Sequence, residues 1–236
     1  MAAAAGIGNF VGGLALTARK TWSASLLKVF VALGAGFMLA VAFLEVLPAS
    51  QQHTTLALPA AFAGYLLVHL FEHGLVPHFH FGEETHHHGE FLTPAGGTGA
   101  FVALTLHSFL DGISIASGFL VSFPLGTLLF LAILIHKLPE GFTLASILLL
   151  TGRSRRQALG GAAALGVACV AGALAMNAAR QWLGLGLALS AGATLYVAAS
   201  DLLPEANREE GVTLPLTVFG GVLLYLCVHL ILRTAL

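Results

Sequence analysis

Long apolar stretches separated by short polar breaks run along the whole chain. A helix needs roughly 20 mostly apolar residues to cross a bilayer, and polar residues mark its ends. By this rule the pattern predicts eight spanning helices, near residues 2–18, 26–47, 56–76, 97–121, 125–150, 158–177, 183–203 and 212–232. We therefore expect an all-α, polytopic membrane protein with a single transmembrane domain over residues 1–236.

The first apolar segment is also compatible with a signal peptide. It lacks the basic residues that open such a peptide. Gly8 and Gly12 have the spacing that lets membrane helices pack closely. We therefore predict a spanning helix for this segment.

Composition agrees with a membrane protein. Hydrophobic residues make up 57% of the chain and charged residues 9%, whereas a soluble domain has about a quarter charged residues. The net charge is −1 and there is no long basic run, so the sequence does not indicate a nucleic-acid partner. Cys169 and Cys227 lie in apolar stretches without metal or redox spacing.

The ten Lys and Arg residues are distributed unevenly between the two sides predicted by the spans. Seven fall on one side, two on the other, and Lys137 lies within a span. The seven are Arg19, Lys20, Lys28, Arg153, Arg155, Arg156 and Arg208. The positive-inside bias then predicts that this side is cytoplasmic, as is loop 77–96, and that both termini lie on the non-cytoplasmic side. We expect the membrane to be the plasma (inner) membrane.

Two parts of the chain resemble each other. The segment GAGFMLAVAFLEVLPAS at 34–50 matches SAGATLYVAASDLLPEA at 190–206, and YLLVHL at 65–70 matches YLCVHL at 225–230. The matched positions include Gly36 and Gly192, Glu45 and Asp201, and Pro48 and Pro204. Chance similarity between apolar helices is the alternative. Nearly equal offsets favour a 3+2+3 inverted repeat, an arrangement typical of transporters.

The fourth and fifth predicted spans carry the chemistry. Each has a histidine, a carboxylate four residues later and then a glycine, in the stretches LTLHSFLDGISIASG and LAILIHKLPEGFTLAS. Residues four apart share one helix face, so His107 and Asp111 would face His136 and Glu140. Each charge at this depth costs at least roughly 2.5–3.5 kcal/mol on a lone helix. Either the four groups bond only to one another, or they bind Zn²⁺, Fe²⁺ or Mn²⁺, which accept such ligands.

These motifs, H-x-x-x-D-G and H-x-x-P-E-G, resemble the paired metal motifs of the ZIP (Zrt-/Irt-like protein) family of divalent metal transporters. The resemblance implies a transport site formed by His107, Asp111, His136 and Glu140. It also implies metal uptake into the cytoplasm, a homodimer, and alternating access in which spans one, four, five and six move against the other four. The metal, with zinc as the first expectation, would then be the substrate, with no resident cofactor and no enzymatic activity.

The chain departs from that family at three positions. Members with a two-metal site usually have Asn after the histidine of span four and an acid after that of span five, where this chain has Ser108 and Lys137. Leu110 replaces a common proline. A lysine ammonium beside two carboxylates can occupy the place of a second cation by charge, so we expect a mononuclear site. The alternatives are that Lys137 snorkels to the membrane surface or joins a purely structural ion pair.

Other ionisable residues could serve the entrance or the exit. Glu45 and Asp201 lie at the ends of spans two and seven, while His69, Glu72 and His73 cluster near the end of span three. We expect His229, the counterpart of His69, to be a packing residue. The loop between spans three and four favours weak, flexible metal capture at the cytoplasmic mouth, with an inert polar loop as the alternative. Its histidines are His78, His80, His86, His87 and His88.

Two other classes of protein use buried histidines and carboxylates in a membrane. An intramembrane zinc-dependent hydrolase would need an activated water and a general base, and the chain has no H-E-x-x-H motif. A membrane haem protein would pair histidines across helices, and neighbouring carboxylates do not suit that ligation. Substrate turnover without metal flux would favour the first class, and a reddish purified protein the second.

Overall fold

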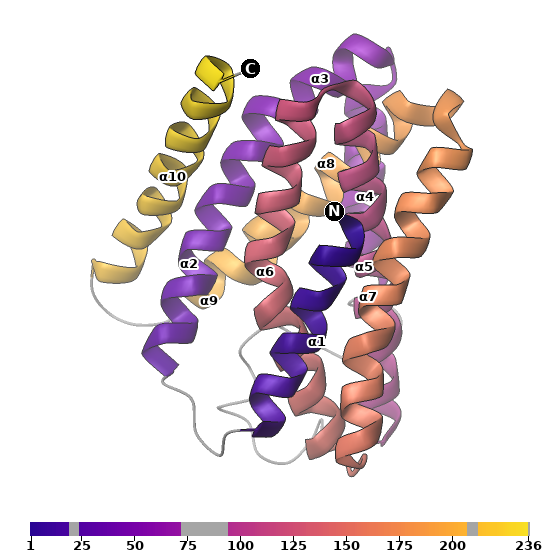
Figure 1. Cartoon of the computed structure of the whole chain (residues 1–236), viewed down its shortest axis with the longest axis vertical. Helices are drawn as coiled ribbons and strands as arrows, with labels where there is room; N and C mark the ends of the chain where they lie inside the picture. The colour runs from indigo at the N-terminus through magenta and orange to yellow at the C-terminus, as the bar shows by residue number, and fades with distance from the viewer. Residues whose placement is uncertain (19–23, 72–93, 207–211, 236) are drawn as a thin grey trace.

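The computed structural model describes residues 1–18, 24–71, 94–206 and 212–235 (Figure 1). Every regular element in these ranges is a helix, and they contain no strand. Glu72, His73 and the histidine-rich loop lie outside the described residues. The all-α prediction is confirmed.

The helices follow one another in eight segments. They are α1 (Ala2–Ala18), α2 (Ala24–Val41) continued by η1 (Ala42–Val46) and α3 (Leu47–His53), α4 (Ala57–Leu70), α5 (Pro94–Val121), α6 (Phe123–Leu150), α7 (Arg155–Ala178), η4 (Arg180–Trp182) with α8 (Leu183–Tyr196), η5 (Val197–Leu202) and α9 (Leu203–Ala206), and α10 (Thr213–Ala235). Six of the described segments are long and apolar enough to cross a membrane. The helices over 2–17 and 57–70 are apolar but shorter.

Local signals explain where the central helices begin. The side chain of Ser122 accepts a hydrogen bond from the backbone of Leu125 at the start of α6, where a proline also lies in the first turn. Ser154 and Gln157 form a capping box at the start of α7. Gly152 has a φ of 85° in the short connection before it, a conformation that favours glycine. We call this end of the bundle, which carries Arg153, the basic end.

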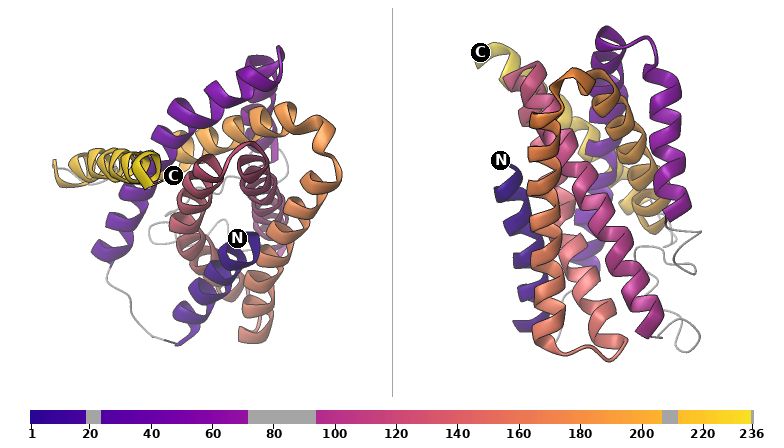
Figure 2. Two further views of the ribbon diagram at one scale, coloured as in Figure 1. Left: turned by 45° about the horizontal axis from the view of Figure 1, so that its top comes forward. Right: turned by 90° about the vertical axis from the view of Figure 1, so that its right-hand side faces the viewer.

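Helices α5 and α6 lie in the middle of the bundle, with other helices around them (Figure 2). Helix α1 packs against α6 and α7, and α7 packs against α5. Helix α4 packs against α8, and α10 against α2. The segments therefore form two units of four, α1, α5, α6 and α7 in the first and α2–α3, α4, α8–α9 and α10 in the second. The two units meet chiefly through α5 with α8 and α2 with α6.

The inverted repeat is visible in the helix directions and in the glycines. Helix α1 runs toward the basic end and α7 away from it (Figure 1). Helices α2 and α8 also run in opposite directions, with α2 away from the basic end and α8 toward it. Gly6 of α1 and Gly166 of α7 face each other, and a Cβ on either would meet the backbone of the other. The two glycines are 160 residues apart, the offset of the matched YLLVHL and YLCVHL segments. Positions that correspond in the two copies of the repeat therefore meet where α1 crosses α7.

The second pair of matched segments also agrees in detail. Gly36 of α2 lies against the backbone of Val218, and its counterpart Gly192 of α8 lies against the backbone of Ala61. Both segments contain a π-helical turn, η1 with Glu45 and η5 with Asp201, at the matched acids. π-Turns inside α-helices are rare and often mark functional sites. Their occurrence at equivalent positions supports a common origin for the two copies.

The third pair of helices is shifted relative to the sequence match. Gly64 of α4 approaches the carbonyl of Leu189, and Gly221 of α10 approaches that of Leu33. The two glycines are 157 residues apart, whereas the matched tyrosines Tyr65 and Tyr225 are 160 apart. An alignment of α4 and α10 by their glycine contacts is therefore shifted by three residues from their alignment by sequence.

We predict that Gly36→Ala and Gly192→Ala each lower the stability of the protein. The added methyl group would overlap a backbone carbonyl oxygen in both cases, and overpacking of this kind costs about 1–3 kcal/mol. The midpoint of thermal unfolding in detergent should fall for both variants. Gly160→Ala is the matched control, because a Cβ on Gly160 meets nothing within 4 Å. Equal stability of all three variants would contradict this packing.

Candidate metal centre

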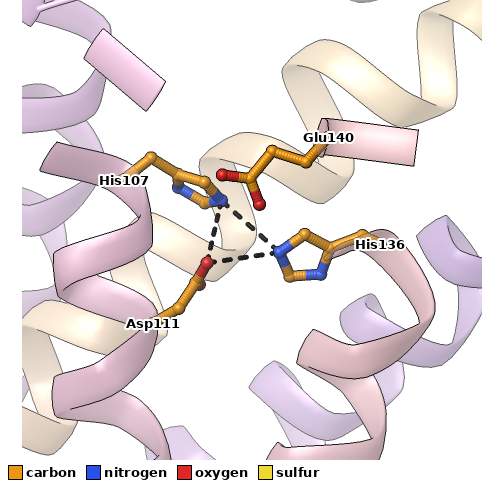
Figure 3. Close-up of side chains that lie close together, drawn as sticks. All are labelled: His107, Asp111, His136 and Glu140. Atoms are coloured by element: carbon orange, nitrogen blue, oxygen red, sulfur yellow. Dashed lines mark hydrogen bonds and ion pairs between the residues drawn. The ribbon is translucent and has the colours of Figure 1, made fainter. Parts of the chain in front are cut away.

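Four ionisable side chains converge between α5 and α6 at the middle of both helices. His107 and Asp111 come from α5, and His136 and Glu140 from α6 (Figure 3). All four are buried, and one ligand atom from each lies within 4.8 Å of the others. The structure thus brings together the four residues that the motifs single out.

The ligand atoms are close and point inward. The Nε2 atom of His107 lies 3.3 Å from Oδ2 of Asp111 and 3.5 Å from Nε2 of His136. The Nε2 atom of His136 lies 3.4 Å from the same carboxylate oxygen. The Nδ1 atom of His136 lies 3.1 Å from the carbonyl oxygen of Ala132. Because a carbonyl only accepts, Nδ1 is the donor, and this bond orients the ring so that Nε2 faces the centre.

Lys137 is part of the same cluster. Its ammonium lies 2.6 Å from Oδ2 of Asp111 and 2.5 Å from Oε2 of Glu140. It also donates to Oγ of Ser108 at 2.8 Å, and Ser108 in turn donates to Oε1 of Glu140 at 2.5 Å. The side chain is 0% exposed. Lys137 therefore does not snorkel, and each of its three ammonium hydrogens has an acceptor.

The glycine of each motif allows a neighbouring helix to approach. Gly112, directly after Asp111, lies against the backbone of Cys169 in α7, and Gly141, directly after Glu140, lies against that of Asn9 in α1. Any side chain at either glycine would push the flanking helix away. The positions in α1 and α7 are again 160 residues apart. The metal motifs are thus built into the symmetric packing of the bundle.

Glu45 has direct partners. Its Oε1 atom lies 2.5 Å from Nδ1 of His229 and accepts a hydrogen bond of 2.8 Å from the hydroxyl of Tyr225. The expectation that His229 only packs is therefore wrong. The ring of His69 lies against Tyr196, with 5.8 Å between ring centroids. Asp201 lies on η5, and its side chain is outside the described part of the structure.

Several other polar residues are buried in the bundle although they belong to no motif of the sequence. Asn9 is fully buried, and neither polar atom of its amide has a partner among the described residues. Hydroxyl side chains are also buried on α5 and α8, namely Ser114, Ser117, Ser190 and Thr194. A polar residue inside an apolar span is the signal that could have marked them.

One of two comparisons with known proteins identifies a family. A search among curated proteins gives no match. The family model described as ZIP zinc transporter matches residues 94–231, a range that includes both halves of the buried cluster and more than half of the chain. The chain therefore belongs to the ZIP zinc transporter family.

Proposed function

We propose that the protein carries a divalent transition metal ion, zinc before Fe²⁺ or Mn²⁺, across the membrane through His107, Asp111, His136 and Glu140. Membership of the ZIP family implies divalent metal transport. The buried His, Asp and Glu ligands are of the kind that these metals accept. Mg²⁺ and Ca²⁺ prefer sites made of oxygen alone.

The distances between ligand atoms support this proposal most strongly. A tetrahedral zinc ion with bonds of about 2.0–2.1 Å separates its ligand atoms by about 3.3–3.4 Å. The three distances among the ligand atoms of His107, Asp111 and His136 are 3.3, 3.4 and 3.5 Å. These atoms are therefore already spaced as three corners of such a tetrahedron, and Glu140 is close enough to provide the fourth.

We propose that the site holds one ion at a time, with Lys137 in place of a second. The charges of the cluster support this assignment. Where the family has an acid after the span-five histidine, a second divalent ion and that acid together add one positive charge. Lys137 also adds one positive charge, and it bonds to both Asp111 and Glu140. The net charge of the loaded cluster is then the same in the two arrangements.

The distribution of charge and the two helix units support a proposal for the orientation of the protein and the movement of its helices. We propose that the basic end faces the cytoplasm, that the ion moves into the cytoplasm, and that both termini lie outside, in the plasma (inner) membrane. The unit of α1, α5, α6 and α7 carries all four ligands, so its displacement against the other unit would move the site from one side to the other. We also propose that the protein works as a homodimer.

The two other functions have less support. A haem would need space between its histidine ligands, and here Nε2 of His107 and of His136 are 3.5 Å apart. A hydrolase needs a general base, and both carboxylates of the cluster, which could serve as one, bind Lys137. Neither alternative explains the inverted repeat.

We predict that His107→Ala and Glu140→Ala each reduce metal uptake at least tenfold, because each removes one of four ligands. Uptake into proteoliposomes should be measured over a panel of Zn²⁺, Fe²⁺, Mn²⁺ and Mg²⁺. His53→Ala is the matched control, since His53 is an exposed histidine at the end of α3. Undiminished flux in both ligand variants would remove the site from the mechanism.

A second prediction concerns the number of bound ions. Elemental analysis of purified, zinc-equilibrated protein should give one mid-membrane ion per protomer, measured as the difference from His107→Ala. Replacement of Lys137 by Asp together with Ser108→Asn restores the usual ligands of a two-metal site, and this double variant should bind a second ion. Two such ions in the natural protein would refute the role of Lys137.

A further inference from the structure

Buried hydroxyl groups line the contact between α5 and α8 on the side of the metal centre away from the basic end. Ser117 of α5 faces α8, because its Oγ lies 3.3 Å from the position that a Cβ would take on Gly186. Ser190 follows Gly186 by four residues and so lies near the same face of α8. Ser117 and Ser190 are 0% and 1% exposed, respectively.

The hydroxyls of Ser117 and Ser190 have no hydrogen-bond partner among the described residues. A serine or threonine inside a membrane helix usually bonds to a carbonyl of its own preceding turn. Thr105 of α5 does so, with its Oγ1 2.6 Å from the carbonyl oxygen of Phe101. Buried hydroxyls without partners are uncommon because each loses the hydrogen bonds it would make with water. The two serines therefore need an explanation that packing does not provide.

The hydroxyls lead toward the metal centre. On α5, Ser117, Ser114 and Asp111 follow one another at steps of three residues, and Asp111 is a proposed ligand. On α8, Ser190 and Thr194 continue the row that Gly186 begins, at steps of four residues. Because neither step equals the 3.6-residue turn, each row winds around its helix along its length. The row on α5 turns from the face that meets α8 to the face that carries the ligand.

The contact between α5 and α8 lies between the two units of the bundle. Helices α5 and α8 belong to different four-helix units. The contact between them is one of the two main contacts between those units. A displacement of one unit against the other would separate them. Such an opening would expose the serine hydroxyls to the side away from the basic end.

We propose that the hydroxyls of Ser117 and Ser190, flanked by Ser114 and Thr194, form a transient subsite for the partly hydrated divalent ion on its way to the metal centre. This inference rests on the proposed transport function. Neutral hydroxyl oxygens can replace some of the waters around the ion, or accept hydrogen bonds from those that remain. Because they carry no charge, they hold the ion weakly and let it pass to the carboxylates.

Cysteine substitution tests the subsite. Ser117→Cys and Ser190→Cys are made in a chain whose natural cysteines are replaced by C169A and C227A. Uptake by cells is followed while a membrane-impermeant, positively charged methanethiosulfonate reagent is added outside. We expect the reagent to reduce uptake at least fivefold in both variants, and zinc to slow the modification. Ala188→Cys is the matched control, since Ala188 is equally buried on α8 and should not react.

A thiol at the subsite should also change metal preference, which a purely structural role would not do. Sulfur is a softer ligand than a hydroxyl oxygen, so Ser117→Cys should lower the KM for Cd²⁺ relative to Zn²⁺ at least fivefold. Ser117→Ala with Ser190→Ala should raise the KM for zinc several-fold and leave the maximal rate within twofold.

If neither cysteine reacts from outside, and the double alanine variant transports like the natural protein while His107→Ala does not transport, the ion takes another route and the proposed function stands. If His107→Ala itself transports normally, the proposed function fails, and this inference with it.

Discussion

Three charged groups are buried at the middle of a membrane protein, and they are stable there because they bind one another. Lys137 bonds to both Asp111 and Glu140, so one positive charge is shared by two negative ones. An unpaired charge at this depth costs at least roughly 2.5–3.5 kcal/mol. One negative charge stays uncompensated while the two neighbouring histidines are neutral. A divalent cation would therefore find side chains that are already assembled and a local charge that attracts it.

The assembly of these groups depends on close approach of helix backbones. Gly112 and Gly141 follow the two acids directly and lie against the backbones of α7 and α1. Gly6 and Gly166 let α1 and α7 cross each other. Without a hydrophobic driving force between helices in lipid, small residues and close packing hold such bundles together. The same glycines that stabilise the first unit thus fix the positions of the proposed metal ligands.

Much of this arrangement could be predicted from the sequence. Apolar length predicts the eight helices, and the four-residue spacing of His107 with Asp111 and of His136 with Glu140 predicts that each pair shares a face. Matched segments predict the inverted repeat, since both copies keep their glycines and acids at equivalent positions.

Other features depend on contacts that the spacing does not encode. The ion pair of Glu45 with His229 joins residues far apart in the chain. The three-residue shift of α10 arises because Gly221 is the residue that contacts α2, whereas the sequence match aligns Tyr225 with Tyr65. Only the three-dimensional arrangement of the described residues shows that Ser117 and Ser190 have no hydrogen-bond partner among them.

We propose above all that His107, Asp111, His136 and Glu140 bind one metal ion together. X-ray absorption spectroscopy at the zinc edge of the zinc-loaded protein measures this directly. We expect a shell of about four nitrogen and oxygen ligands at about 2.0–2.1 Å, with the multiple-scattering signal of two imidazoles, one of which is lost in His136→Ala. A shell that contains sulfur, or an all-oxygen shell without imidazole, would contradict it.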